Sequence, residues 1–100
     1  MELVETDYGY KEIYNTGTIR HYNNKDQKHN PSGPAVETLF GRKEYFLNGL
    51  YHRTDGPAVV WPNGEKAFFK HGKPHNATGP AIVFYDTELH FINGRYVWNM

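Results

Sequence analysis

Three segments of the sequence decide the fold: HNPSGPAV at residues 29–36, HRTDGPAV at 52–59 and HNATGPAI at 75–82. All three have His, Gly, Pro and Ala at the same four positions, and they begin 23 residues apart. A second landmark keeps this spacing at Asn48-Gly49, His71-Gly72 and Asn93-Gly94, with a last interval of 22 residues. Self-similarity at such a period is typical of repeat architectures. It predicts three repeats, at residues 29–51, 52–74 and 75–96.

Each repeat has the pattern of a β-hairpin. In the second repeat, residues 58–61 are β-branched and aromatic, as strands prefer. Asn63-Gly64 is typical of a two-residue type I′ turn, and residues 66–70 form the returning strand. Gly or Pro recurs so often that no stretch without either exceeds 13 residues, which argues against helices. We therefore expect an all-β fold, an antiparallel meander of hairpin repeats in a single sheet of about eight strands.

The chain of 100 residues is expected to be one domain. Residues 10–28 have the pattern of a degenerate N-terminal hairpin, with a turn at Gly17 and a strand over residues 19–22.

The predicted turns determine which side chains share a face, because side chains alternate sides along a strand. The expected core face pairs a small residue with a large one in each repeat: Ala35 with Phe46, Ala58 with Phe69, and Ala81 with Phe91. The last pair assumes a loop over residues 85–87. The opposite face mixes aromatic, aliphatic and lysine side chains. Either the N-terminal segment, a second copy or a partner covers part of that face, or the sheet curls and buries both faces itself.

Composition excludes several classes of protein. Lys and Arg number 11, as do Asp and Glu, so the formal net charge is zero. This argues against a nucleic-acid binder driven by bulk charge and against a polybasic membrane anchor. The chain has no cysteine, which rules out disulfides, thiol nucleophiles and thiolate metal sites. No apolar run approaches the roughly 18 residues of a spanning helix, so we expect a cytoplasmic protein without a membrane partner.

The repeated histidines invite a metal site, but their spacing argues against one. Equivalent positions of successive hairpins lie two strands apart, roughly 9–10 Å. Zinc needs nitrogen ligands about 2 Å from one ion. We therefore expect His29, His52 and His75 to pack their rings or to form hydrogen bonds in turns, and we expect no metal and no cofactor.

A catalytic site is equally weakly indicated. His52 and Asp55 share one loop, yet Ser32 and Thr78 replace Asp55 in the other repeats, which is typical of side chains that cap a turn. Ser32 is the only serine and has no Asp in its loop. The sequence also lacks a Gly-rich phosphate loop followed by a helix. We expect no catalytic residues and no enzymatic activity.

The succession Asn-Gly-x-x-His-x-x-x-Gly-Pro-Ala, as found from Asn48 to Ala58, resembles the MORN hairpin repeat. MORN repeats have Gly-x-Gly where this chain has Gly-Pro-Ala. The sequence is more similar to a MORN-like variant, His-x-x-Asp-Gly-Pro-Ala, of bacteriophage and giant-virus proteins. The resemblance covers residues 29–96 well and 10–28 poorly. It implies a protein-interaction or scaffolding module, with no family catalytic residues.

On this basis we expect a non-catalytic protein-interaction module that acts through the mixed face. The resemblance implies a small phage or viral effector that inhibits a host factor, such as a defence-system component, in the host cytoplasm. The expected partner-binding residues are Tyr45, Arg53, Trp61, Lys66, Phe68 and Phe84. They include the Trp, Tyr and Arg that usually anchor such surfaces.

Two further expectations concern partners. The same aromatic rings with Lys66 nearby suit the stacking of nucleotides, so nucleic-acid or nucleotide binding is the alternative function. A homodimer is expected through the mixed face or through the C-terminal edge at residues 96–100, where no charged residue protects an open strand.

Overall fold

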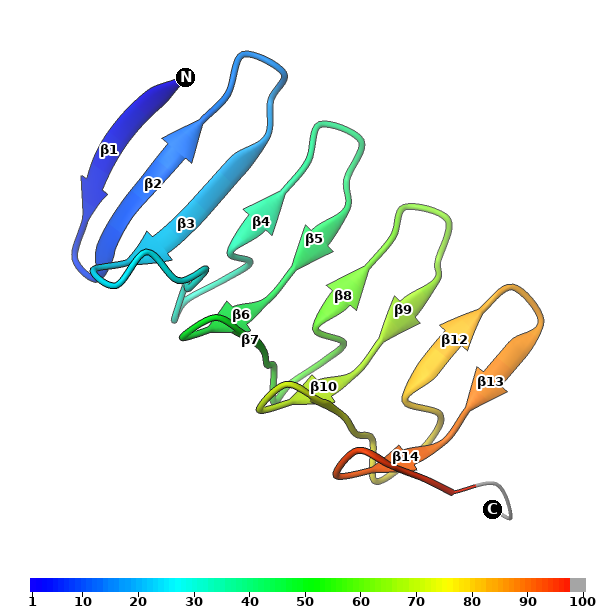
Figure 1. Ribbon diagram of the computed structural model, residues 1–100. Helices are drawn as coiled ribbons and strands as arrows, with labels where there is room; N and C mark the ends of the chain where they lie inside the picture. The colour runs from blue at the N-terminus through cyan, green and yellow to red at the C-terminus, as the bar shows by residue number, and fades with distance from the viewer. Residues whose placement is uncertain (98–100) are drawn as a thin grey trace.

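The computed structural model describes residues 1–97, and within them the chain forms strands and turns without a helix (Figure 1). The strands of the main sheet are β1 (Glu2–Thr6), β2 (Gly9–Ile13), β3 (Ile19–Asn23), β4 (Val36–Glu37), β5 (Lys43–Glu44), β8 (Val59–Val60), β9 (Lys66–Ala67), β12 (Ile82–Phe84) and β13 (Thr87–Leu89). They pair antiparallel in the order β1-β2-β3-β4-β5-β8-β9-β12-β13. The predicted all-β antiparallel meander is confirmed.

The second part of each repeat leaves the main sheet and forms a small hairpin of its own. These hairpins are β6 (Phe46–Leu47) with β7 (Leu50–Tyr51), β10 (Phe69–Lys70) with β11 (Lys73–Pro74), and β14 (Phe91–Ile92) with β15 (Arg95–Tyr96). In Figure 1 they line one long side of the main sheet. The described residues therefore contain more strands than the expected eight, in four sheets instead of one.

The Asn-Gly landmark is the turn of each small hairpin. Asn48 has a φ of 49° and Gly49 a φ of 83°, and the other two repeats show the same pair of positive angles. Two positive φ values in a two-residue loop define a type I′ turn, whose twist matches that of the flanking strands. The sequence analysis had placed this turn type at Asn63-Gly64 instead.

The hairpins of the main sheet turn through a longer loop than predicted. The Trp61 amide donates to the Glu65 carbonyl (2.9 Å), and the Gly64 amide donates to the Trp61 carbonyl (3.1 Å). Pro62 holds φ near −65°, which suits the start of a type I turn, and Gly64 at φ 92° adds the bulge residue that completes a three-residue loop. The predicted two-residue turn at Asn63-Gly64 is therefore wrong.

The longer loop shifts the strand register by one residue. Val59 lies opposite Ala67 and Val60 opposite Lys66. The predicted pairing of Ala58 with Phe69 is wrong, because a shift of one residue moves every side chain to the other face. The first repeat shows the same shift, with Val36 opposite Glu44.

The third repeat reaches the same register with a shorter loop. Phe84 pairs with Thr87 and Ile82 with Leu89, so only Tyr85 and Asp86 lie between the strands. The predicted loop over residues 85–87 is wrong by one residue. The deletion that shortens the last interval of the repeat is thus absorbed in this loop.

The core is thin and lies along the first strand of each repeat. The protein measures 47 × 26 × 17 Å. The three repeated alanines, Ala35, Ala58 and Ala81, are fully buried, and Val36 and Val59 are 3% exposed. Among the paired residues, the buried Val36, Val59 and Ala67 lie in one cross-strand row, because Val36 and Val59 both lie opposite Glu44 and Val59 lies opposite Ala67. They share one face of the main sheet, and Val60 and Lys66 on the other face are less buried. The burial of the paired residues thus gives no support to a sheet that buries both faces itself.

A prediction follows from the close approach of β2 and β3 at Gly9. A Cβ there would lie 2.1 Å from the carbonyl oxygen of Tyr22, so Gly9→Ala forces the strands apart. We expect Gly9→Ala to lower the free energy of unfolding by about 3 kcal/mol in urea denaturation. Gly64→Ala is the matched control, because its Cβ would meet open space and only the positive φ is strained, which costs about 1 kcal/mol. Equal losses in the two variants would contradict the close packing.

Candidate protein-binding surface

The structure divides the six predicted site residues between the two faces of the main sheet. Lys66 lies opposite Val60, so Trp61, the next residue of that strand, points to the other face. Lys66 also lies opposite Val83, so Phe84, the next residue of β12, points to the face opposite Lys66 as well. The single mixed face expected from the sequence does not exist in this form, because it rested on the wrong register.

Tyr45, Phe68 and Lys66 remain together on the first of these faces. The Tyr45 amide donates to the Ala58 carbonyl, and the Phe68 amide donates to the Ala81 carbonyl. Both residues therefore extend the antiparallel pairing of the main sheet by one position. The ammonium of Lys66 lies 5.9 Å from the centre of the Phe68 ring. The loops that contain the Gly-Pro-Ala motif stand beside these two aromatic rings.

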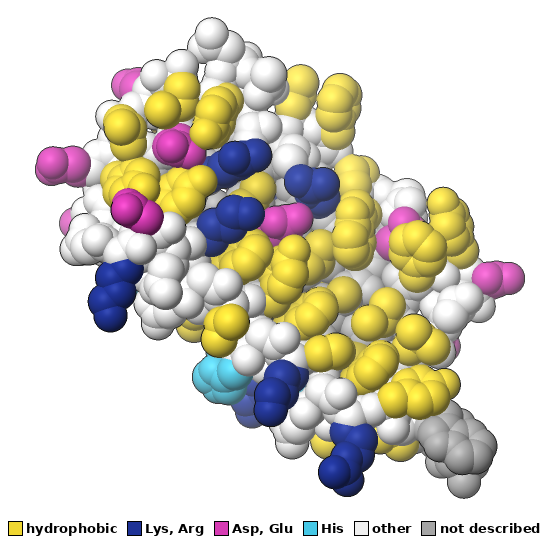
Figure 2. All heavy atoms as spheres, viewed as in Figure 1, with side chains coloured by type: hydrophobic (Ala, Val, Ile, Leu, Met, Phe, Trp, Pro, Cys, Tyr) yellow, Lys and Arg dark blue, Asp and Glu magenta, His cyan; other side chains and the backbone are white. Residues whose placement is uncertain are grey.

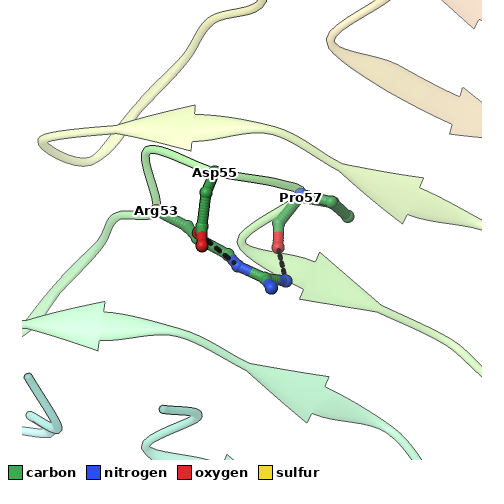
Figure 3. A network of polar contacts seen from close by, with 3 residues as sticks. All are labelled: Arg53, Asp55 and Pro57. Carbon is green, nitrogen blue, oxygen red and sulfur yellow. Dashed lines mark hydrogen bonds and ion pairs between the residues drawn. The ribbon is translucent and has the colours of Figure 1, made fainter. Parts of the chain in front are cut away.

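Arg53 holds its own loop together. Its Nε donates to Asp55 and its Nη1 donates to the carbonyl of Pro57, both at 3.1 Å, as Figure 3 shows. The guanidinium lies 3.9 Å from the ring centre of Tyr45 and so covers one side of that ring. A Cβ at Gly56 would come within 3.0 Å of the guanidinium carbon. Arg53 therefore has a structural role that the sequence analysis missed.

Asn30 and Asn76 stabilise the equivalent loops of the other two repeats. Each donates its side-chain amide to the proline carbonyl four residues on, at 3.0 and 2.9 Å. Each accepts the backbone amide and the hydroxyl of Ser32 or Thr78. In the first and third repeats an Asn side chain thus pairs with a hydroxyl two residues later, and in the second repeat Arg53 pairs with the carboxylate of Asp55. The predicted bonding of Ser32, Asp55 and Thr78 to backbone amides is wrong: their side chains bond to the side chain two residues earlier, and Asn30 and Asn76 accept the turn amides instead.

The repeated histidines tie each small hairpin to the start of its repeat. The Nδ1 of His29 accepts the amide of Asn48, that of His52 accepts His71, and that of His75 accepts Asn93. All three hydrogen bonds measure 2.9 Å. The expected turn hydrogen bond of these histidines is confirmed. Among residues 1–97, no three His, Asp or Glu side chains gather closely enough to hold a metal ion.

Successive Gly-Pro-Ala loops leave a hollow between them. The first hollow, of about 610 Å³, lies between the loops of the first two repeats, and Tyr45 lines it. The second, of about 400 Å³, lies between the next two loops and is lined by Phe68 and Lys70. Arg53 borders both. Several polar groups of these loops bond to one another, as the contacts of Asn30, Arg53 and Asn76 show.

A more exposed apolar surface lies at the tips of the main-sheet hairpins. Phe40 is 83% exposed, Tyr85 78%, Leu39 65% and Phe84 46%. With Trp61 and Pro62, these residues form what we call the tip stripe: Leu39, Phe40, Trp61, Pro62, Phe84 and Tyr85. In Figure 1 the loops that carry them follow one another along the side of the sheet away from the small hairpins. Figure 2 shows hydrophobic side chains gathered along this margin.

The tips are fixed against one another. A Cβ at Gly17 would touch Leu39, and one at Gly41 would touch Pro62. The Tyr85 amide donates to the carboxylate of Glu65 at 3.0 Å. Since equivalent residues lie roughly 9–10 Å apart, the three tips span about 20 Å. Contacts between neighbouring tips therefore make the stripe one continuous surface and not three independent loops.

Two members of the stripe, Trp61 and Phe84, are among the site residues predicted from the sequence. The signal for the others was present, since Leu39, Phe40 and Tyr85 are large apolar residues inside loops, where Gly, Asn, Asp and Ser are usual. The C-terminal edge expected at residues 96–100 falls partly outside the described residues, which end at Val97. No protein-family model, curated protein sequence or solved structure matches the chain.

Removal of Arg53 tests its structural role. We expect Arg53→Ala to lower the free energy of unfolding by about 1–2 kcal/mol, because the Pro57 carbonyl and Asp55 lose their donor. The double variant R53N/D55S copies the Asn and Ser of the first repeat, and should recover more than half of that loss. Thermal unfolding of the three proteins makes the comparison. A double variant no more stable than Arg53→Ala would contradict the equivalence of the loops.

The histidine hydrogen bond predicts a dependence of stability on pH. Burial lowers the pKa of His52 below its ordinary value of 6.5, and the nearby His71 and Lys70 act in the same direction. The unfolded chain then binds the proton more readily, so stability is fully present above pH 6.5 and is lost as the pH falls through the folded-state pKa. Protonation also removes the Nδ1 acceptor.

We expect the melting temperature to fall between pH 7.5 and pH 5, by about 5 °C for a loss of about 1 kcal/mol at the His52 hydrogen bond. His52→Asn keeps an acceptor at this position but does not titrate, so its melting temperature should fall less over the same range. An equal fall in the variant and the wild type would contradict the role of His52.

Proposed function

We propose that the chain is a non-catalytic protein-binding module and that the tip stripe is its contact surface. The observation that carries the proposal is the exposure of Leu39 and Phe40 on the main-sheet hairpin of the first repeat and of Tyr85 on that of the third, with Trp61 and Pro62 on the hairpin between them. Large apolar side chains gathered on the surface of a small protein mark an interaction site. Within residues 1–97, the other large exposed apolar side chains lie elsewhere in the fold.

The composition of the stripe suits a protein partner. Phe40, Tyr85 and Trp61 are rigid aromatic anchors of the kind that dominate binding energy. Charged groups border the stripe: Arg42 follows its first loop and pairs with Glu44 at 3.4 Å, and Asp86 adjoins Tyr85. An apolar centre with a charged rim is the usual anatomy of a protein interface.

The geometry gives less support to nucleic-acid binding. Trp61 and Phe84 lie on the opposite face from Lys66, so only two of the four predicted aromatic rings, Tyr45 and Phe68, share a face with it. Arg53 covers one side of Tyr45. The resemblance to phage and giant-virus repeats adds to the proposal that the protein partner is a host factor in the host cytoplasm, which the chain would inhibit by occupying its surface.

The double variant F40S/Y85S tests the stripe. We expect wild-type protein immobilised on a support to retain a stoichiometric partner from host lysate after nuclease treatment, and F40S/Y85S to lose at least nine-tenths of it. Both side chains are largely exposed, so the fold should persist, as judged by far-ultraviolet circular dichroism. Mass spectrometry identifies the retained protein.

Leu50→Ala is the matched control, because Leu50 is 52% exposed but lies in a small hairpin away from the stripe. It should retain the partner. Retention of the partner by F40S/Y85S at the wild-type level would refute the stripe as the contact surface. Loss of the retained protein from the wild type after nuclease treatment would favour the nucleic-acid alternative.

A further inference from the structure

The outermost strand of the main sheet has the features of a docking edge. β1 is five residues long, whereas the strands of the repeats are two or three residues long. It ends the sheet in Figure 1, and among residues 1–97 no strand pairs with its outer side. An unpaired edge of this length is a template on which another strand can add through backbone hydrogen bonds.

The ladder geometry identifies the backbone groups that point outward. The Tyr14 amide donates across the β2–β3 loop, so Tyr14 bonds toward β3. Bonding directions alternate along a strand, so Lys11 bonds toward β1, where its partner in the register is Val4. The neighbours of Val4 therefore direct their amide and carbonyl groups away from β2. These neighbours are Leu3 and Glu5.

Apart from Thr6, the side chains of β1 are acidic or apolar. Glu2 and Glu5 are exposed, and Asp7 follows in the adjoining turn. Leu3 is 62% exposed. Residues 1–10 contain no Lys or Arg. Two copies paired along β1 would bring these carboxylates into one seam, which like-charge repulsion opposes, whereas a basic strand would complement them.

We propose that β1 binds an extended, basic segment of a partner protein as an added antiparallel strand. The segment places Lys or Arg opposite Glu2 and Glu5, and apolar side chains opposite Leu3 and Val4. Read from its N-terminus it has a small polar residue, a basic residue, two apolar residues and a basic residue, as in Thr-Lys-Val-Leu-Arg. This surface lies at the first strand of the sheet and is separate from the tip stripe, so the proposal goes beyond the function proposed above.

A synthetic peptide that contains Thr-Lys-Val-Leu-Arg tests the edge. We expect nuclear magnetic resonance to show that the peptide slows hydrogen exchange of the Leu3 and Glu5 amides, whereas the Val4 amide is already protected without it. Charge reversal in E2K/E5K should weaken the binding of this peptide by about tenfold or more. The same variant should gain affinity for the peptide Thr-Glu-Val-Leu-Glu.

Two controls leave the folded protein unchanged. Peptide methylated on the backbone nitrogens that would donate to the Leu3 and Glu5 carbonyls should not bind, because those hydrogen bonds cannot form. F40S/Y85S should bind the unmodified peptide like the wild type, so failure of this edge and failure of the tip stripe are distinguishable.

Three results would overturn the proposal. The first is unchanged exchange of the Leu3 and Glu5 amides with saturating peptide. The second is equal affinity of wild type and E2K/E5K. The third is protection of these amides that rises with protein concentration in the absence of peptide, which would make a second copy of the chain the occupant.

Discussion

The hydrogen bond from a turn amide to the Nδ1 of a histidine joins the two parts from which each repeat is built. A two-stranded hairpin of four paired residues is marginal in water on its own. Here the Asn48 amide donates to His29, and the Gly49 amide donates to the carbonyl of Lys28. The small hairpin is thereby held beside the main sheet, where the Phe46 and Tyr51 rings stack with a separation of 4.3 Å.

This arrangement explains how so thin a protein orders its backbone. Few side chains are deeply buried in a body 17 Å thick, and the fully buried ones are alanines. Stability then depends on contacts that recur along the chain. The Tyr51 ring, for example, contacts Phe46 of its own repeat and Phe69 of the next, at 4.3 and 5.0 Å. Each repeat thus completes the packing of the one before it.

The sequence was sufficient for the repeat, the fold class and the role of the histidines, because these follow from residue identities at a fixed period. It was insufficient for the register. Asn63-Gly64 and Asn48-Gly49 give the same local turn signal, but Pro62 selects a type I turn with an added glycine in the first case. One residue of loop length reversed the faces of Trp61 and Phe84, and with them the composition of the expected site. The contacts of Arg53 within its own loop were missed for another reason: they become apparent only when Arg53 is compared with Asn30 and Asn76, which occupy the same position in the other repeats.

The absorbed deletion at Tyr85-Asp86 has a consequence for how such a protein can change over time. The loop shortened by one residue while Ile82 still pairs with Leu89, so the sheet tolerated the loss without a change in register. Each histidine forms its hydrogen bond within its own repeat. A whole unit of 23 residues can therefore be duplicated or removed without breaking this hydrogen bond in any other repeat. Each unit gained or lost would move the ends of the molecule apart or together by about 10 Å. The length of the protein is thus open to selection in discrete steps, independently of the chemistry that folds it.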